Sequence, residues 1–252
     1  MSRQAAKRVL VVAGLGNGYG TGAAAARLFA RNGYSVALVG RGAKVANELA
    51  ETIITDGGHA TPFTIPSYSH QDITQTWAAI HKHFPKPEYA VRAALFNVSG
   101  RVFKPFLDTT PEDVQECLQT GIAAAFAFSR GAILTFKEND NEQSSGKRGT
   151  LIFTGATAGI RGNTYTSAFA ASKFGLRALS QSLAKEFGKE DIHVAHSIID
   201  GAILLQPEPS SQGMVDKNLR PESIASSYLY LTNQDRSAMT WELDLRPSQE
   251  KW

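Results

Sequence analysis

The chain has 252 residues, 42% hydrophobic and 19% charged, a globular balance that argues against disorder and allows one large α/β domain. The net charge of +3 is small and no basic run contains interleaved aromatic residues, so nucleic acid is not an expected partner. One cysteine excludes an intrachain disulfide, and no apolar run suggests a membrane span or signal peptide, so we expect a cytoplasmic protein without a membrane partner.

Short apolar runs alternate with longer helical patterns along the chain. The apolar runs predict strands over 8–13, 35–39, 60–65, 92–97, 149–154, 192–199 and 241–245. The segments between them predict helices over 20–32, 43–56, 70–84, 111–137, 165–188 and 221–232. Continuously apolar strands are typical of parallel sheets that are covered on both faces. The pattern predicts a single α/β domain over 1–252, a doubly wound Rossmann-type fold with a seven-stranded parallel sheet flanked by helices.

Two segments lie outside this regular pattern. Residues 137–148 are polar and are predicted to form a solvated loop. Residues 201–220 contain Pro207, Pro209 and Gly213 near the end of the predicted sheet. This second segment is either a substrate loop or a plain surface connection.

A glycine-rich run follows the first predicted strand and precedes an alanine-rich helix: Ala13-Gly14-Leu15-Gly16-Asn17-Gly18-Tyr19-Gly20-Thr21-Gly22. Glycines let the backbone turn tightly and approach a pyrophosphate, and the helix N-terminus offers free N–H groups to that anion. A merely flexible turn is the alternative, but the position between strand and helix favours a dinucleotide site.

The second predicted strand ends in Val39-Gly40-Arg41, without a carboxylate. An acidic residue at this point would bind the ribose 2′-hydroxyl of NAD. Arg41 can instead stack on adenine and pair with a 2′-phosphate, or it is simply a solvated residue at a helix start. The strand end therefore favours NADP(H) over NAD(H).

Several motifs resemble the short-chain dehydrogenase/reductase family over nearly the whole chain. They are the spacing of Gly14, Gly18 and Gly20, then Asn97-Val98-Ser99-Gly100, Ala171-Ser172-Lys173 and Asp200-Gly201. The resemblance implies a homodimer or homotetramer with a small-molecule substrate. It assigns the cofactor to Gly14, Asn17, Gly18, Tyr19, Gly20, Arg41, Asn97, Ser99, Gly100, Lys173 and Ile203. Asn17 departs from the pattern, because members that prefer NADP(H) often carry a basic residue there.

The resemblance also defines the catalytic positions. In this family a tyrosine is the general acid, a lysine lowers the pKa of that tyrosine, and a serine and an asparagine complete the site. Lys173 keeps the lysine position, which puts Phe169 at the tyrosine position and Ala156 at the serine position. Residues 124–126, aligned with the family's Gly-x-Phe, put Gly121 at the asparagine position. Phenylalanine has no hydroxyl to protonate an alkoxide, and alanine cannot donate to a carbonyl oxygen. Ordinary carbonyl reduction by the family mechanism is therefore not expected.

Reduction of an imine or iminium needs hydride but no proton delivery to oxygen, so an NADPH-dependent reductase of such a pre-activated substrate is the first hypothesis. The Phe-Ala-Ala-Ser-Lys run at 169–173 and the Leu-Asp-Leu-Arg-Pro run at 243–247 resemble an atypical branch of the family. That branch includes fungal enzymes of bicyclic indole-alkaloid biosynthesis, and the resemblance implies iminium reduction with an accompanying intramolecular Diels–Alder cyclisation. Catalysis would then rest on hydride positioning in a shaped apolar pocket.

Three residues are candidates for catalysis: Lys173, Asp200 and Tyr165. Asp200 replaces a proline beside the expected nicotinamide site, where a carboxylate can stabilise a cation or take a proton, or merely form a turn. Tyr165 lies one predicted helical turn before Phe169 and is the candidate acid of a carbonyl reductase, or a surface aromatic residue. Ala156, Tyr165 and Phe169 are predicted to line the substrate pocket. A non-catalytic NADP(H)-binding pseudo-reductase or sensor is the remaining alternative.

Overall fold

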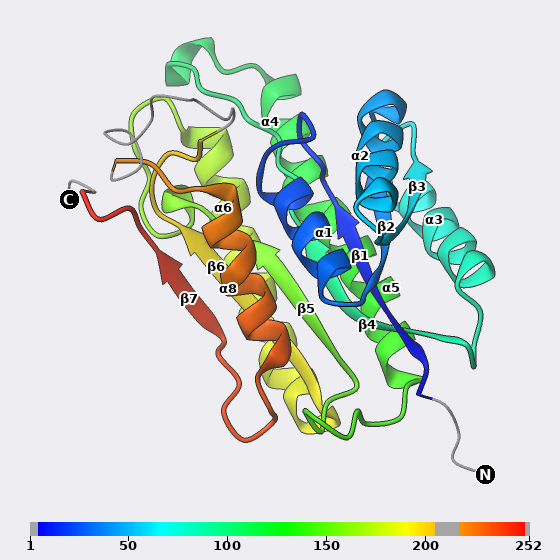
Figure 1. Ribbon diagram of the computed structural model, residues 1–252. Coiled ribbons are helices and arrows are strands. Elements are labelled where there is room, and N and C mark those ends of the chain that lie inside the picture. The colour runs from blue at the N-terminus through cyan, green and yellow to red at the C-terminus, as the bar shows by residue number, and fades with distance from the viewer. Residues whose placement is uncertain (1–4, 205–216, 250–252) are drawn as a thin grey trace.

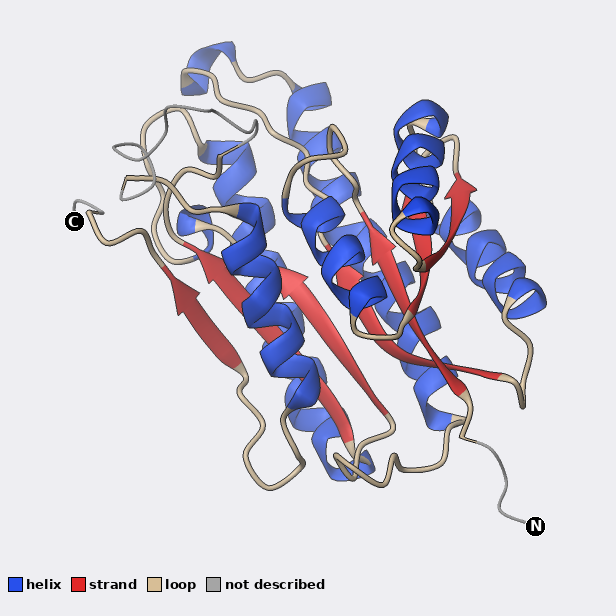
Figure 2. Ribbon diagram, viewed as in Figure 1, coloured by secondary structure: helices blue, strands red, loops and turns tan. Residues whose placement is uncertain are grey.

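The computed structural model describes residues 5–204 and 217–249. In these residues seven parallel strands form one sheet in the order β3-β2-β1-β4-β5-β6-β7 (Figures 1 and 2). The strands are β1 (Lys7–Ala13), β2 (Ser35–Gly40), β3 (His59–Thr64), β4 (Tyr89–Phe96), β5 (Gly149–Thr154), β6 (Ile192–Ile199) and β7 (Glu242–Leu245). The order reverses between β1 and β4, and open α/β sheets bind ligands in the crevice at the carboxyl ends beside such a reversal.

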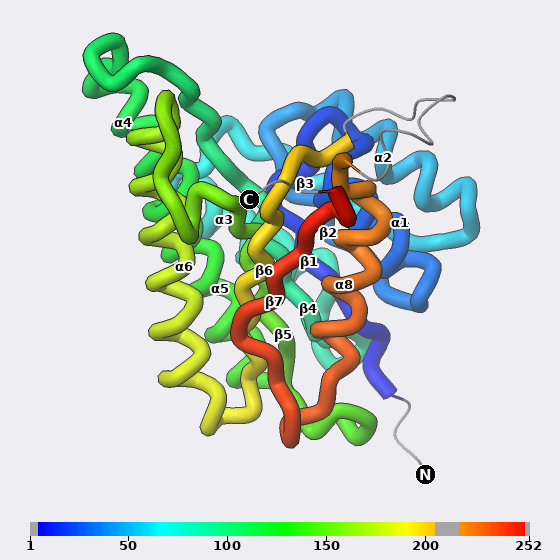
Figure 3. Tube along the Cα trace, turned by 90° about the vertical axis from the view of Figure 1, so that its left-hand side faces the viewer, coloured from blue at the N-terminus to red at the C-terminus, as the bar shows by residue number. Residues whose placement is uncertain are grey.

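Helices cover both faces of the sheet, as Figure 3 shows edge-on. One face carries α1 (Thr21–Arg31), α2 (Ala43–Thr55) and α8 (Pro221–Asn233). The other carries α3 (His70–His83), α4 (Pro111–Leu118), α5 (Ala124–Lys137) and α6 (Ser167–Phe187). Because both faces are covered, every residue of β2, β5 and β6 is buried. The predicted fold class is confirmed.

The helix predicted over 111–137 is not one regular helix. A π-helical turn, Gln119–Ala123, joins α4 to α5 and contains the buried Gly121. The segment Pro111–Lys137 is also long and apolar enough to cross a membrane by length and composition. The expectation that no apolar run suggests a membrane span is therefore corrected. However, 56% of its most apolar stretch is buried within the protein, as in the core helix of an α/β domain.

The polar segment 137–148 was predicted to be solvated, and this is wrong for part of it. Lys147 is only 2% exposed, and its Nζ donates to the carbonyl oxygens of Thr232 at 3.0 Å and Leu231 at 3.4 Å, in the last turn of α8. Burial lowers the pKa of Lys147 to about 8. The segment therefore fastens α8 to the amino-terminal edge of the sheet.

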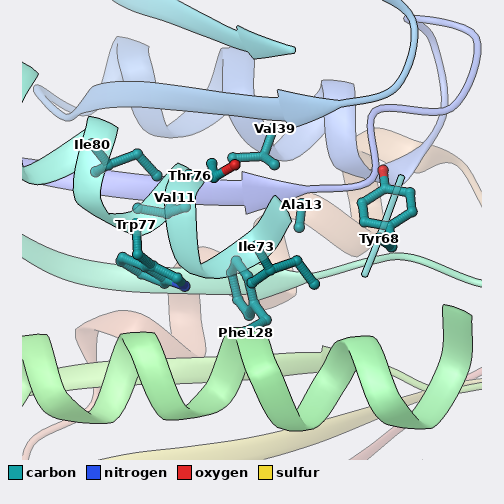
Figure 4. A pocket seen from close by; sticks show the side chains of 9 residues that line it. All are labelled: Val11, Ala13, Val39, Tyr68, Ile73, Thr76, Trp77, Ile80 and Phe128. Atoms are coloured by element: carbon teal, nitrogen blue, oxygen red, sulfur yellow. The ribbon is translucent and has the colours of Figure 1, made fainter. Parts of the chain in front are cut away.

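A small cavity lies between the sheet and helices α3 and α5 (Figure 4). Its lining is almost wholly apolar: Val11, Ala13, Val39, Tyr68, Ile73, Thr76, Trp77, Ile80 and Phe128. The Thr76 hydroxyl donates within its own helix, to the carbonyl oxygen of Asp72 at 2.7 Å. Because its walls offer so few polar groups, this cavity is space in the core and not the site of the chemistry.

Candidate active site

The glycine loop after β1 packs against the end of β4. Gly14 has a φ angle of +95°, and a Cβ atom there would lie 2.7 Å from the carbonyl carbon of Asn97. Asn97 donates from Nδ2 to the Gly14 carbonyl oxygen at 2.9 Å, and Arg27 donates to the Gly18 carbonyl oxygen at 2.9 Å. Glycine is therefore required at position 14. Asn97, predicted as a cofactor residue, supports the loop with its side chain.

The loop leads directly to the N-terminus of α1. The N-cap residue is Gly20, and no side chain caps the helix. The Thr21 hydroxyl is buried without a hydrogen-bond partner among the described residues. Asn17 accepts a hydrogen bond from the Tyr19 N–H at 3.1 Å and so shapes the turn. A tight turn, an uncapped helix N-terminus and an unpartnered hydroxyl fit a pyrophosphate.

Arg41 follows β2 directly and has a largely exposed guanidinium. It lies 5.4 Å from the centre of the Tyr68 ring and 4.0 Å from a carboxylate oxygen of Glu116. At this distance and exposure the ion pair is weak, so the guanidinium keeps donors for another anion.

The remaining predicted cofactor residues lie along the same carboxyl edge of the sheet. Ser99 is partly buried and donates from Oγ to the Gly100 carbonyl oxygen at 3.3 Å. A Cβ atom on Gly100 would lie 2.6 Å from Thr120 Oγ1 and 3.1 Å from Cys117 Cα, so this turn packs closely on the end of α4 and on the π-helical turn. Ile203 forms a parallel bridge with Leu219, which fastens together the two ends of the predicted substrate loop. Residues 205–216 of that loop lie outside the described residues.

Phe169 lies in the first turns of α6, one helical turn before Lys173. Its ring is buried, clusters with Ala156 and is 5.3 Å from the Phe103 ring. The structure thus brings together the predicted pocket residues Ala156 and Phe169 as an apolar wall. Neither side chain can donate a proton.

Lys173 is buried beneath that wall. Its Nζ donates to the Thr154 carbonyl oxygen at 2.9 Å and is 5.9 Å from the centre of the Phe169 ring. Burial lowers the pKa of Lys173 to about 8, and the positive charge of Arg101 acts in the same direction. At neutral pH Lys173 is therefore mostly protonated and forms a fixed positive charge in the site.

Tyr165 lies before α6 and not on it, because the helix begins at Ser167. Its backbone is left-handed, with φ of 66°, and its carbonyl oxygen accepts a hydrogen bond from the Lys104 N–H. The side chain is 59% exposed. The one-turn offset from Phe169 assumed from the sequence is therefore wrong, and Tyr165 is not buried in the wall that Phe169 forms.

Asp200 follows β6 and is completely buried. One of its carboxylate oxygens accepts hydrogen bonds from Thr157 Oγ1 at 2.6 Å and from Arg161 at 3.2 Å. The other lies 2.8 Å from a guanidinium nitrogen of Arg246. Such a paired carboxylate is not an open base, so the geometry favours a positioning role for Asp200. Both arginines are distant in the sequence, and no spacing rule could have paired them with Asp200.

Gly121, at the family's asparagine position, lies where α6 presses on the π-helical turn. A Cβ atom on Gly121 would overlap Ser172 Oγ. That hydroxyl is buried and has no hydrogen-bond partner among the described residues. Ser172 therefore occupies the space that a larger side chain at position 121 would need.

Comparison with known proteins agrees with this geometry. A family model described as short chain dehydrogenase matches residues 7–203. The chain belongs to the short-chain dehydrogenase/reductase family of oxidoreductases. It is 30% identical over 184 residues to the human 3-oxoacyl-[acyl-carrier-protein] reductase, covering 73% of this chain and 72% of that protein. It is also 26% identical over 253 residues to a short-chain dehydrogenase/reductase of Armillaria gallica, covering 92% of each.

Solved structures show the same fold. A short-chain dehydrogenase from Rhodopseudomonas palustris is 29% identical, with a TM-score of 0.78 over 96% of this chain and 99% of that one. A metagenomic short-chain oxidoreductase in complex with NADP is 20% identical, with a TM-score of 0.78 over 97% and 99%. The architecture that carries the site is therefore that of the family.

Proposed function

We propose that this protein is an NADPH-dependent reductase whose substrate is a protonated imine or an iminium ion. The bond that it reduces is the C=N bond. The observation that carries the proposal is the apolar wall formed by Phe169 and Ala156 above a buried Lys173. A carbonyl substrate would need a proton donor at this wall, and neither Phe169 nor Ala156 can donate a proton. A substrate that already carries its positive charge does not need one.

The described residues fit NADP(H). The Gly14 turn, the uncapped α1 and the unpartnered Thr21 hydroxyl provide a cradle for the pyrophosphate. Arg41, exposed at the end of β2, provides the charge for a 2′-phosphate, and β2 ends without a carboxylate that would repel it. Lys173 would face the nicotinamide ribose, as the family pattern implies.

NADPH supplies a hydride from the C4 atom of its nicotinamide. With this hydride, the carbon of a bound iminium would be reduced and its nitrogen would recover a lone pair, so the product amine would need no proton from the protein. The buried Phe169 ring would limit the access of water to the reacting carbon, and Lys173, held by its hydrogen bond to Thr154, would orient the cofactor side of the pocket. Catalysis then rests on orientation and exclusion of water.

The test is a panel of cyclic imines and matched ketones incubated with the protein and NADPH, with the absorbance of the reduced cofactor as the readout. We expect imine-dependent oxidation of NADPH and little with ketones. Tight NADPH binding without turnover on any substrate would contradict a reductase and would leave the pseudo-reductase or sensor.

Replacing Tyr165 by Phe tests the remaining alternative, a carbonyl reductase that uses Tyr165 as its acid. Because Tyr165 is exposed and off the helix, we expect the Tyr165→Phe variant to reduce imines at the wild-type rate. Loss of turnover in that variant would instead make Tyr165 the acid of a carbonyl reductase.

The resemblance of residues 169–173 and 243–247 to the alkaloid branch supports a further part of the proposal. It extends the activity to bicyclic indole-alkaloid biosynthesis, with cyclisation of the reduced product in the same pocket. Reaction of an azadiene precursor with and without the protein, followed by the stereochemistry of the product, tests this extension. A racemic product in the presence of the protein would contradict it.

A further inference from the structure

Among the described residues, the substrate end of the site contains more positive than negative charge. Lys173 and Arg101 interact electrostatically, and within the described ranges neither has a carboxylate at ion-pair distance. Arg101 is exposed and begins the segment that follows Gly100. No carboxylate of the described residues therefore neutralises the Arg101 guanidinium.

The segment that starts at Arg101 is fixed across the front of the site. The Phe103 ring packs on Phe169, and the Lys104 N–H donates to the Tyr165 carbonyl oxygen at 3.0 Å. Lys104 is neutralised by Asp113, at 2.6 Å. These contacts fix the segment that carries Arg101 beside the apolar wall, while Lys104, the next cation along it, is already paired.

Arg161 is a second cation whose charge is incompletely neutralised. One of its nitrogens lies 3.2 Å from Asp200, but 39% of the side chain is exposed. Asp200 divides its charge between Arg161 and Arg246, and Asp244 binds Arg246 through two further hydrogen bonds. A guanidinium has five N–H donors, so Arg161 keeps donors for a ligand.

A charge balance of the described residues follows from these contacts. Asp200 and Asp244 bind Arg161 and Arg246, whereas no carboxylate of the described ranges pairs with Arg101 or with the protonated Lys173. A cationic C=N bond next to an excess of positive charge is disfavoured, most strongly where the site is screened from water. A carboxylate on the substrate would supply compensating charge at this point.

We propose that the substrate carries a carboxylate next to its C=N bond, and that Arg101 and Arg161 bind this carboxylate. The inference rests on the proposed function and narrows its substrate class to imino acids. The zwitterion has no net charge, and its carboxylate lies towards the arginines while its C=N carbon lies at the Phe169 wall. Asp200 is a positioning residue, because it fixes Arg161 from beneath.

A binding measurement tests the carboxylate site independently of turnover. The protein loaded with NADP⁺ is titrated calorimetrically with isoquinoline-1-carboxylate and with isoquinoline, which share one ring system and differ only by the carboxylate. We expect the carboxylate to bind at least about tenfold more tightly, and the Arg101→Gln and Arg161→Gln variants each to lose most of that difference. Arg161→Lys keeps a positive charge next to Asp200, so this variant should retain part of the difference in affinity. Equal binding of the two ligands by the wild type would overturn the proposal.

Turnover gives the second readout. The ratio of kcat/KM for 3,4-dihydroisoquinoline-1-carboxylate to that for 3,4-dihydroisoquinoline should be high in the wild type and fall in Arg101→Gln. Arg130→Gln, at an exposed position on α5, is the control and should leave the ratio unchanged. Equal rates with both imines would overturn the carboxylate site and leave the reductase, whereas carboxylate binding without any turnover would overturn the reductase and support the site.

Discussion

Phe169 and Lys173 are one turn apart on α6, and the site depends on the contrast between them. Lys173 fixes the register in the sequence, so the positions of Phe169 and Ala156 could be predicted, and the structure brings both into one apolar wall. The role of Asp200 could not be predicted in the same way. Its partners, Arg161 and Arg246, reach it through the fold and not through local spacing.

Restoring the two missing hydroxyls should restore carbonyl chemistry. In the Ala156→Ser, Phe169→Tyr double variant a phenol replaces the ring that lies 5.9 Å from the Lys173 Nζ, and a serine hydroxyl stands beside it. We expect NADPH-dependent ketone reduction to rise by about 100-fold or more over the wild type, since a positioned general acid contributes on that order. Steady-state ketone reduction measures this, and each single variant is its control. Equal ketone activity in the wild type and the double variant would show that the wall does not determine substrate class.

At the scale of elements, the strands and helices were predictable because their apolar patterns are strong. Each observed strand begins and ends within three residues of its prediction. The π-helical turn at Gln119–Ala123 was not predictable, because the apolar pattern runs on without a break. It becomes intelligible only through Ser172 of α6, which occupies the space beside Gly121.

That contact can be measured by a double-mutant cycle. Gly121→Ala places a methyl group against Ser172 Oγ, so we expect it to lower the free energy of unfolding by about 1–3 kcal/mol, the usual cost of overpacking. Ser172→Ala removes a hydroxyl that has no partner among the described residues and should cost little. The double variant should regain much of the loss in urea unfolding. Strictly additive effects would mean that the two residues do not meet.

The junction between Lys147 and α8 predicts a pH effect. The pKa of Lys147 is about 8 in the folded protein and about 10.4 in an unfolded chain, so between these values the unfolded state binds more protons. The wild type should therefore gain about 2 kcal/mol of unfolding free energy relative to Lys147→Met when the pH rises from 7 to 10. Chemical unfolding at both pH values measures this, with Lys185→Met at an exposed position of α6 as the control. An identical pH dependence in the wild type and Lys147→Met would rule out the buried cation as its source.

At the scale of the whole molecule, the strand order and the site at the carboxyl edge follow from the alternation of strands and helices, and the family match agrees with them. Surface features were harder to predict, because periodicity alone does not show which apolar side chains stay uncovered. Phe126 on α5 and Phe174 on α6 are 58% and 44% exposed. Exposed aromatic side chains on two neighbouring helices are typical of a surface that another chain covers.

We expect the protein to form a homodimer or homotetramer through α5 and α6. The Phe126→Glu, Phe174→Glu double variant should shift its mass towards the monomer in light scattering coupled to size exclusion, because two charges would have to be buried. Ile54→Glu, at an equally exposed position on α2, is the matched control and should keep the wild-type mass. A monomeric wild type, or an unchanged mass in the double variant, would contradict this interface.

The transfer of deuterium from NADPH that carries deuterium at both C4 positions tests hydride transfer to a C=N bond most directly. The wild type is given 1-methyl-3,4-dihydroisoquinoline and 1-tetralone, an imine and a ketone of similar shape, and the products are analysed by mass spectrometry. We predict one deuterium in the amine, formed at least about 100-fold faster than any labelled alcohol. The account would be contradicted if labelled alcohol formed as fast as the amine. It would also be contradicted if the protein bound NADPH but the amine contained no deuterium.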